Sequence, residues 1–188
     1  MMKLLFKILI IIFSILPTFA MESTRGLDGF QANKIDAVKN ARLHSNMGNI
    51  YFQQENYVSA LREYQIAYNL TYNLNSSSVY LFNMSKCFMK ANNYKLAQNA
   101  LLKAIKKDCM NITYYDSLVD TYIALNEADK ELKKYLNDYS NPYNRIIAGL
   151  IYLKTGKTTN AKIIFDEFIV SNPDMLITND IKVILKKL

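Results

Sequence analysis

The chain has 188 residues, of which 51% are apolar and 12% aromatic, so it is about one domain long and can bury a packed core. Only 5 glycines and 3 prolines occur, which argues against a turn-rich all-β fold. The formal net charge is +7, and without Lys3 and Lys7 the remainder carries 21 − 16 = +5. Most lysines are spaced as on outer helix faces, which favours a solvated surface over an acidic partner or an anionic membrane.

Residues 1–20 have the pattern of a secretory signal peptide. Lys3 and Lys7 supply the positive end, residues 8–16 the apolar core, and residues 17–20 a helix break with small residues before a cleavage site. The apolar stretch from Ile8 to Met21 is 14 residues, whereas a transmembrane helix needs about 20. We therefore predict cleavage after Ala20 and a periplasmic or secreted protein. The alternative is an uncleaved inner-membrane anchor.

Residues 21–40 are predicted to be a flexible lead-in and the start of the first helix. A repeated pattern then begins with residues 41–74. Met47, Gly48 and Tyr51 share one helical stripe, and Ala60, Tyr64 and Ala67 form a second. The turn between the two helices is expected at residues 53–57.

The same pattern returns in residues 78–111. Ser85, Phe88 and Ala97 follow Gly48, Tyr51 and Ala60 by 37 residues each. Because the pattern shifts as one block, we interpret residues 73–77 as a polar loop inserted between intact repeats.

Two further units follow. Residues 112–141 form a shortened repeat, with a good first helix through Tyr115 and Tyr122 and a shorter turn near Asn126. Its second helix has no A-x3-F match. Residues 142–175 again match well, with Gly149, Phe165 and, near the end, Pro173. Residues 176–188 are predicted to form a capping helix. Its N-cap candidates are Thr178, Asn179 and Asp180, and its apolar stripe consists of Ile181, Ile184, Leu185 and Leu188.

These units resemble tetratricopeptide repeats (TPRs), whose signature is W-x2-L-G-x2-Y…A-x3-F…P at a period near 34 residues. The resemblance implies an all-α fold, an α-solenoid of about four TPR helix hairpins (41–74, 78–111, 112–141 and 142–175) with a C-terminal capping helix at 176–188. The alternative is an unrelated helical bundle.

No catalytic constellation, metal site or cofactor site is predicted, so we expect a protein that is not an enzyme. The single His44 falls in a packing slot. Cys87 and Cys109 lack C-x-x-C spacing and are expected to be unpaired thiols. The glycines form no phosphate-binding loop. Asp116 and Asp120 lie one helical turn apart, and we interpret them as solvated or peptide-binding carboxylates.

In TPR arrays the first helices line a concave groove that holds a peptide or a partner helix. The resemblance implies a protein-binding groove here, lined by Arg42, Asn49, Phe52, Phe82, Asn83, Lys86, Asp116, Asp120 and Leu150. Chaperone-binding TPR domains grip a C-terminal carboxylate with two asparagines and three basic residues. Asn49 and Asn83 match the asparagines, but the basic places hold Ser45, Thr113 and Ser117. That grip is therefore incomplete.

The function predicted is an exported, non-catalytic scaffold or adaptor that binds a protein segment, in assembly or maintenance of the cell envelope. Its partner is expected to be a protein or peptide and not nucleic acid, with membrane contact only through an uncleaved N-terminus. One alternative is a self-assembling or membrane-anchored structural subunit. A third is a glycan-binding envelope component, indicated only by the 14 tyrosines.

Overall fold

The computed structural model describes residues 34–188, which form helices joined by short turns and connections, without a strand. The chain divides into two units after Asn40, and only residues 34–40 of the first unit are described. The first described helix covers residues 34–53, and its residues 41–53 belong to the second unit. The predicted signal peptide and most of the predicted lead-in lie outside the described residues. None of the described helices is long and apolar enough to cross a bilayer.

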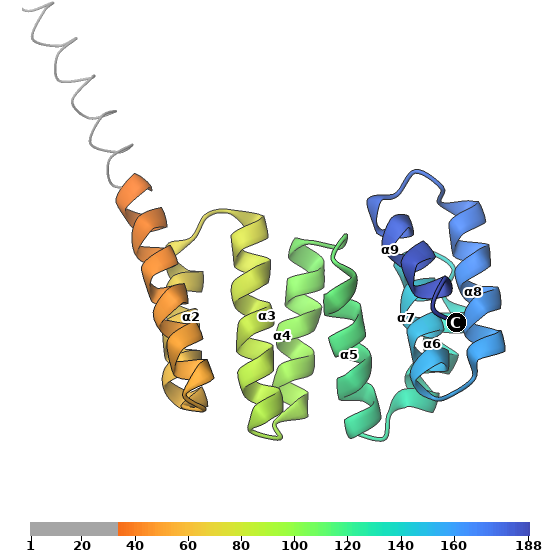
Figure 1. The fold of residues 1–188 in the computed structure, drawn as a ribbon, viewed down its shortest axis with the longest axis horizontal. Helices are drawn as coiled ribbons and strands as arrows, with labels where there is room; N and C mark the ends of the chain where they lie inside the picture. Colours follow the sequence, from red (N-terminus) through yellow and green to blue (C-terminus); the bar gives the residue numbers. More distant parts are fainter. Residues whose placement is uncertain (1–33) are drawn as a thin grey trace, which may run out of the picture. The chain divides into compact units, whose positions relative to one another are not determined.

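The rest of the second unit is a succession of helix hairpins (Figure 1). Neighbouring helices pack on one another in chain order, and α5 also packs on α7. The expected all-α solenoid is therefore confirmed. Its helices after residue 53 are α2 (Tyr57–Leu70), α3 (Leu74–Lys90), α4 (Tyr94–Lys107), α5 (Ile112–Ala124), α6 (Ala128–Asn137), α7 (Tyr143–Lys154), α8 (Thr158–Ser171) and α9 (Leu176–Leu185).

Within each of the four hairpins, a turn of the same geometry joins the first helix to the second. Each has one residue with positive φ: Glu55 at 60°, Asn92 and Asn126 at 56°, and Gly156 at 78°. The next residue donates its N–H to the carbonyl of an aromatic residue five positions back, at 2.9 Å for Asn56 to Tyr51 and 2.8 Å in the other three turns. These are the bonds of the Schellman motif, which ends a helix through a left-handed residue.

The turns correct one expectation about the third hairpin. Its turn at Asn126 has the same length as the others, so the turn is not shortened. The positive-φ residues are separated by 37, 34 and 30 positions (92 − 55, 126 − 92, 156 − 126). The last interval is short because α6 has 10 residues where α4 has 14. The third hairpin therefore lacks about one helical turn at the end of its second helix.

The three extra residues before the second hairpin are also placed differently from the expectation. They lengthen α3, which has 17 residues and begins at Leu74, and do not form a loop. Asn73 is the N-cap, and its side-chain oxygen accepts a hydrogen bond from the Ser76 N–H at 3.1 Å. Asn56 and Asn111 cap α2 and α5 in the same way. Asparagine thus serves the helix starts because its side chain satisfies an otherwise unpaired N–H.

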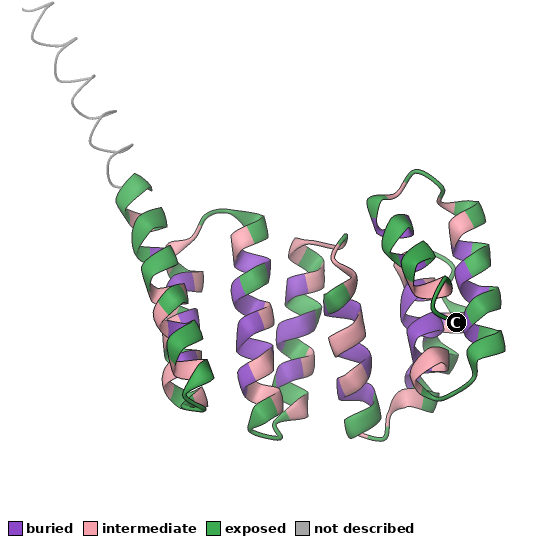
Figure 2. Cartoon of the chain, in the orientation of Figure 1, coloured by how far each residue is buried: buried purple, intermediate pink, exposed green. Residues whose placement is uncertain are grey.

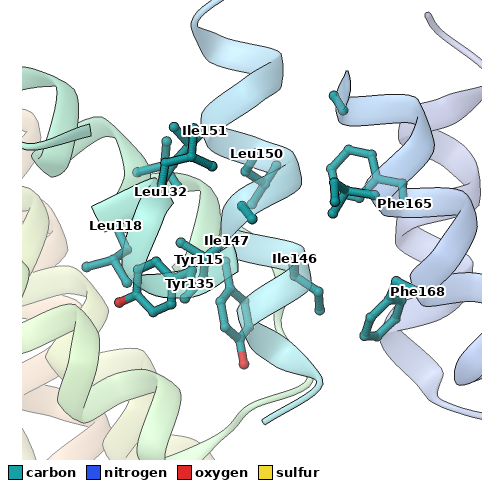
Figure 3. Packing of buried hydrophobic residues seen from close by; sticks show 14 of the residues in the cluster. Tyr115, Leu118, Leu132, Tyr135, Ile146, Ile147, Leu150, Ile151, Phe165 and Phe168 are labelled. Carbon is teal, nitrogen blue, oxygen red and sulfur yellow. The ribbon is translucent and has the colours of Figure 1, made fainter. Parts of the chain in front are cut away.

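Small residues let the two helices of a hairpin approach closely. Gly48 faces the ring of Tyr64, and Gly149 faces the ring of Phe165. Ser85 stands in the same place in the second hairpin and is fully buried. Figure 2 shows buried residues concentrated where helices meet. The largest core cluster joins residues of α4 through α9, and Figure 3 shows Leu150 and Ile146 of α7 facing Phe165 and Phe168 of α8.

The helix α9 packs on α8, as expected for a capping helix. Ile177 and Ile181 are fully buried in the core cluster. The helix begins earlier than predicted, at Leu176, and Met175 is its N-cap residue. Thr178 is therefore no cap: it is buried, and its hydroxyl donates to the Asn172 carbonyl at 2.6 Å.

Candidate functional site

The first helices of the four hairpins join side by side through their own side chains. Lys86 of α3 reaches Phe52 of the 34–53 helix. Phe82 of α3 packs on Tyr114 of α5, with ring centroids 5.1 Å apart. Lys154 of α7 reaches back to α5. We call this surface the first-helix face, and it is represented by Asn49, Phe52, Phe82, Lys86, Asp116, Asp120 and Lys154.

Lys86 lies between two aromatic rings. Its Nζ is 5.3 Å from the centroid of Phe52 and 5.2 Å from that of Phe82, within the range of cation–π attraction. Burial lowers the pKa of Lys86, since a desolvated ammonium is less stable than a hydrated one. Phe52 is itself held edge-on against Tyr57 of α2. Lys86 and the two rings beside it, which come from two different hairpins, are therefore held in fixed positions.

Asp116 and Asp120 share one cation. The Nζ of Lys154 lies 2.9 Å from Asp116 Oδ1 and 2.6 Å from Asp120 Oδ1, and it also donates to the Asp116 carbonyl at 3.2 Å. The sequence reasoning placed most lysines on outer faces and missed this contact. Lys154 follows Asp120 by 34 residues, whereas the third and fourth hairpins are offset by 30, so the repeat spacing gave no signal for this contact. The cluster carries a net charge of −1, not −2.

Asn49 and Arg42 lie on exposed positions of the 34–53 helix. The side-chain oxygen of Asn49 accepts a hydrogen bond from the Tyr64 hydroxyl at 2.8 Å, which fixes the amide and leaves its N–H groups as donors. Arg42 lies near Tyr80, whose pKa is raised by burial while the arginine charge opposes that rise. Both residues can therefore be reached from solvent.

Two predicted site residues are corrected by their burial. Leu150 is 1% exposed and belongs to the core between α7 and α8, so it cannot line a binding surface (Figure 3). Asn83 is 8% exposed, so at most the edge of its side chain meets solvent. Helical periodicity alone did not show that α7 is covered on so many sides: residues 146 to 151 are all buried.

The histidine and the two cysteines, which also have reactive side chains, do not come together in a site. His44 Nδ1 lies 2.6 Å from Glu63 Oε2, so the histidine joins the 34–53 helix to α2. Both cysteines are free, with Cys87 buried and Cys109 half-buried. Within residues 34–188 no group of three or more metal-ligating side chains comes together.

A hollow of about 430 Å³ lies beside the short helix α6. Its walls come from α4, α5, α6 and α7 and from the connections after α4 and before α7. None of the nine predicted site residues lines it. The lining residues are Leu102, Ile105, Lys106, Cys109, Tyr115, Tyr135, Asn141, Tyr143, Asn144 and Ile147.

The described residues form an α-solenoid similar to those built from tetratricopeptide repeats: its helix hairpins share one turn geometry, small residues pack closely between helices, and α9 covers α8. Neither a protein-family model nor a curated protein matches the sequence.

Several solved structures are similar to this chain. MamA is 18% identical, with a TM-score of 0.49, over 76% of this chain and 84% of MamA. YrrB, a TPR protein with an unusual peptide-binding site, is 19% identical, with a TM-score of 0.44, over 79% of this chain and 75% of YrrB. PilF of Pseudomonas aeruginosa is 17% identical, with a TM-score of 0.47, over 81% of this chain and 72% of PilF.

Proposed function

We propose that this protein is an exported, non-catalytic TPR scaffold that binds a segment of a partner protein along its first-helix face. One observation carries the proposal. The face is continuous from the 34–53 helix to α7, yet it displays cations, carboxylates, an amide and aromatic rings that are only partly used in packing. A mixed surface of this kind offers apolar contact together with directional polar contacts, which is what specific recognition of a peptide needs.

The export part of the proposal is supported by the sequence of residues 1–20. A positive end, a short apolar core and small residues before position 21 are the features of a cleaved signal peptide. A cell-envelope location follows if that segment is removed after translocation. The mass of the protein recovered from cells decides this: an N-terminus at Met21 or a near neighbour supports the proposal, and retention of Met1 contradicts it.

The binding part is tested with variants of the first-helix face. The full chain, carrying an affinity tag, is used to capture partners from envelope extracts. A double variant, Asn49→Ala with Lys86→Glu, changes the exposed amide and the cation. Lys103→Glu is the matched control, because Lys103 is exposed on α4, a second helix of a hairpin. The proposal requires that the double variant loses a partner that the control retains. If both variants capture the same proteins, the first-helix face is not the binding surface.

A second candidate is a self-assembling structural subunit, and one observation favours it. Leu43, Ile50 and Val58 are 56%, 53% and 82% exposed on the first hairpin, where no earlier repeat of the second unit covers them. Exposed apolar residues at the end of a solenoid are suited to stacking on another copy. Light scattering after size exclusion separates the candidates: a monomer that does not associate at high concentration excludes self-assembly.

A further inference from the structure

Lys86 differs from the other cation of the first-helix face in its partners. Lys154 has two carboxylates within 3 Å. Among the described residues, Lys86 has no carboxylate within salt-bridge distance, and its contacts are the two aromatic rings. The two acidic residues of the neighbouring first helix α5, Asp116 and Asp120, are engaged by Lys154. The structure therefore holds a half-buried ammonium whose charge is not neutralised by the residues described.

A half-buried charge without a counter-charge is costly, and an anion that arrives from outside removes part of that cost. The rings of Phe52 and Phe82 shield the site on two sides from water, which strengthens a charge–charge contact made there. Asn49 lies three positions before Phe52 on the same helix, so its free N–H donors are about one turn away. The surroundings thus combine a cation, amide donors and apolar ring surfaces.

We propose that Lys86 binds the carboxylate of an aspartate or glutamate within the bound segment, and that Phe52 and Phe82 contact an apolar residue beside it. The inference rests on the proposed function and adds the chemistry of the ligand. It also differs from the grip on a C-terminal carboxylate that the TPR resemblance raised. That grip uses positions 45, 113 and 117, which are not basic here, and it does not use the position of Lys86.

The experiment selects ligands from a display library of random short peptides with the full chain, with Lys86→Glu and with the control Lys103→Glu. The wild type and the control are expected to enrich acidic residues next to apolar ones. Lys86→Glu is expected to lose that enrichment and to enrich lysine and arginine in its place. Lys86→Gln, selected in parallel, loses the acidic preference without gaining a basic one.

A selected peptide then measures the size of the effect. Replacing its acidic residue by the matching amide is expected to weaken binding to the wild type about 10- to 100-fold, and to leave binding to Lys86→Gln almost unchanged. Circular dichroism of each variant confirms that it is folded.

The outcomes separate the two proposals. If the wild type selects peptides without acidic enrichment, or if Lys86→Glu selects the same peptides, the acidic ligand is wrong and the scaffold function stands. If the wild type selects no peptide, peptide binding itself is contradicted, and the acidic ligand with it.

Discussion

The α-carbon of Gly48 packs directly against the ring of Tyr64, and a Cβ built on the glycine would lie 2.7 Å from Tyr64 Cε1. Tyr64 has no room to withdraw, because it is 1% exposed and its hydroxyl is bonded to Asn49. The fourth hairpin repeats this relationship more tightly, with 2.3 Å between a Cβ on Gly149 and Phe165 Cε1. The absence of a side chain at these two positions sets the distance between the helices.

Replacing either glycine by alanine is therefore expected to destabilise the fold. Overpacking costs about 1–3 kcal/mol, which exceeds the roughly 1 kcal/mol that alanine adds through helix propensity. The loss should be larger for Gly149→Ala than for Gly48→Ala. Urea unfolding followed by circular dichroism measures both. Asn46→Ala, at an exposed position of the same helix as Gly48, is the control and should not lower stability; equal losses in all three variants would contradict the packing argument.

The hairpins were predictable from the sequence because their close packing needs particular residue types at fixed spacing. Gly48, Tyr51 and Ala60 mark the first hairpin, and the aromatic residues at 51, 88, 122 and 152 all supply the carbonyl that closes a turn. The third hairpin was harder. Five residues after the positive-φ residue the first hairpin has Ala60, whereas the third hairpin has Glu131, a buried glutamate paired with Lys134. Because a charged residue occupies this position, the sequence pattern did not show where the second helix of the third hairpin begins. The shortening was therefore predicted at the turn near Asn126 and not at the end of α6.

Removing Lys154 is expected to leave two carboxylates one helical turn apart without their shared cation. Lys154→Met should lower the free energy of unfolding by about 1 kcal/mol at low salt, because partly exposed ion pairs contribute roughly 0.2–1 kcal/mol each. High salt should reduce the loss, since it screens the repulsion between Asp116 and Asp120. Urea unfolding at two salt concentrations measures both effects.

The same loss in stability at low and high salt would mean that Lys154 acts through its aliphatic stem. The triple variant Asp116→Asn, Asp120→Asn, Lys154→Met removes all three charges. It should recover part of the stability lost in Lys154→Met alone, because no like charges remain to repel one another.

The site was less predictable than the fold because exposure depends on how neighbouring repeats pack. Periodicity placed Leu150 and Phe82 at equivalent faces of their helices, yet Leu150 is buried and Phe82 is half-buried. The engagement of Asp116 by Lys154 joins residues 38 positions apart, which a spacing within one helix does not reveal. The resemblance and helical periodicity therefore predicted which residues share a face, and the packing of the adjacent hairpin decided which of those side chains remain accessible.

The last helix, α9, is expected to contribute to stability through its buried side chains. Ile181→Ala should lower the free energy of unfolding by about 2–4 kcal/mol, because a fully buried isoleucine loses its contacts and leaves a cavity. Val183→Ala, on the same helix but 51% exposed, should change it by less than about 0.5 kcal/mol. Thermal unfolding of the two variants measures the difference. If both are equally stable, α9 does not cap the core in solution.

The two cysteines are expected to react at very different rates. Burial raises the pKa of the Cys87 thiol to about 11. At pH 8 only about one Cys87 thiol in a thousand is then ionised, and the thiolate is the form that attacks a disulfide reagent. Cys109 lies on the wall of the hollow beside α6 and is half-buried. An aromatic disulfide reagent added to the native protein at pH 8 should therefore label one thiol quickly.

The single variants assign that thiol. Cys87→Ser should keep the fast reaction and Cys109→Ser should lose it. In Cys109→Ser, raising the pH from about 8 to about 9 should speed the labelling of Cys87 roughly tenfold, because the thiolate fraction rises tenfold for each pH unit below the pKa. Denaturant should then expose Cys87 and bring its rate close to that of a free thiol. Fast labelling of Cys87 in folded Cys109→Ser would show that α3 opens in solution to expose this side chain.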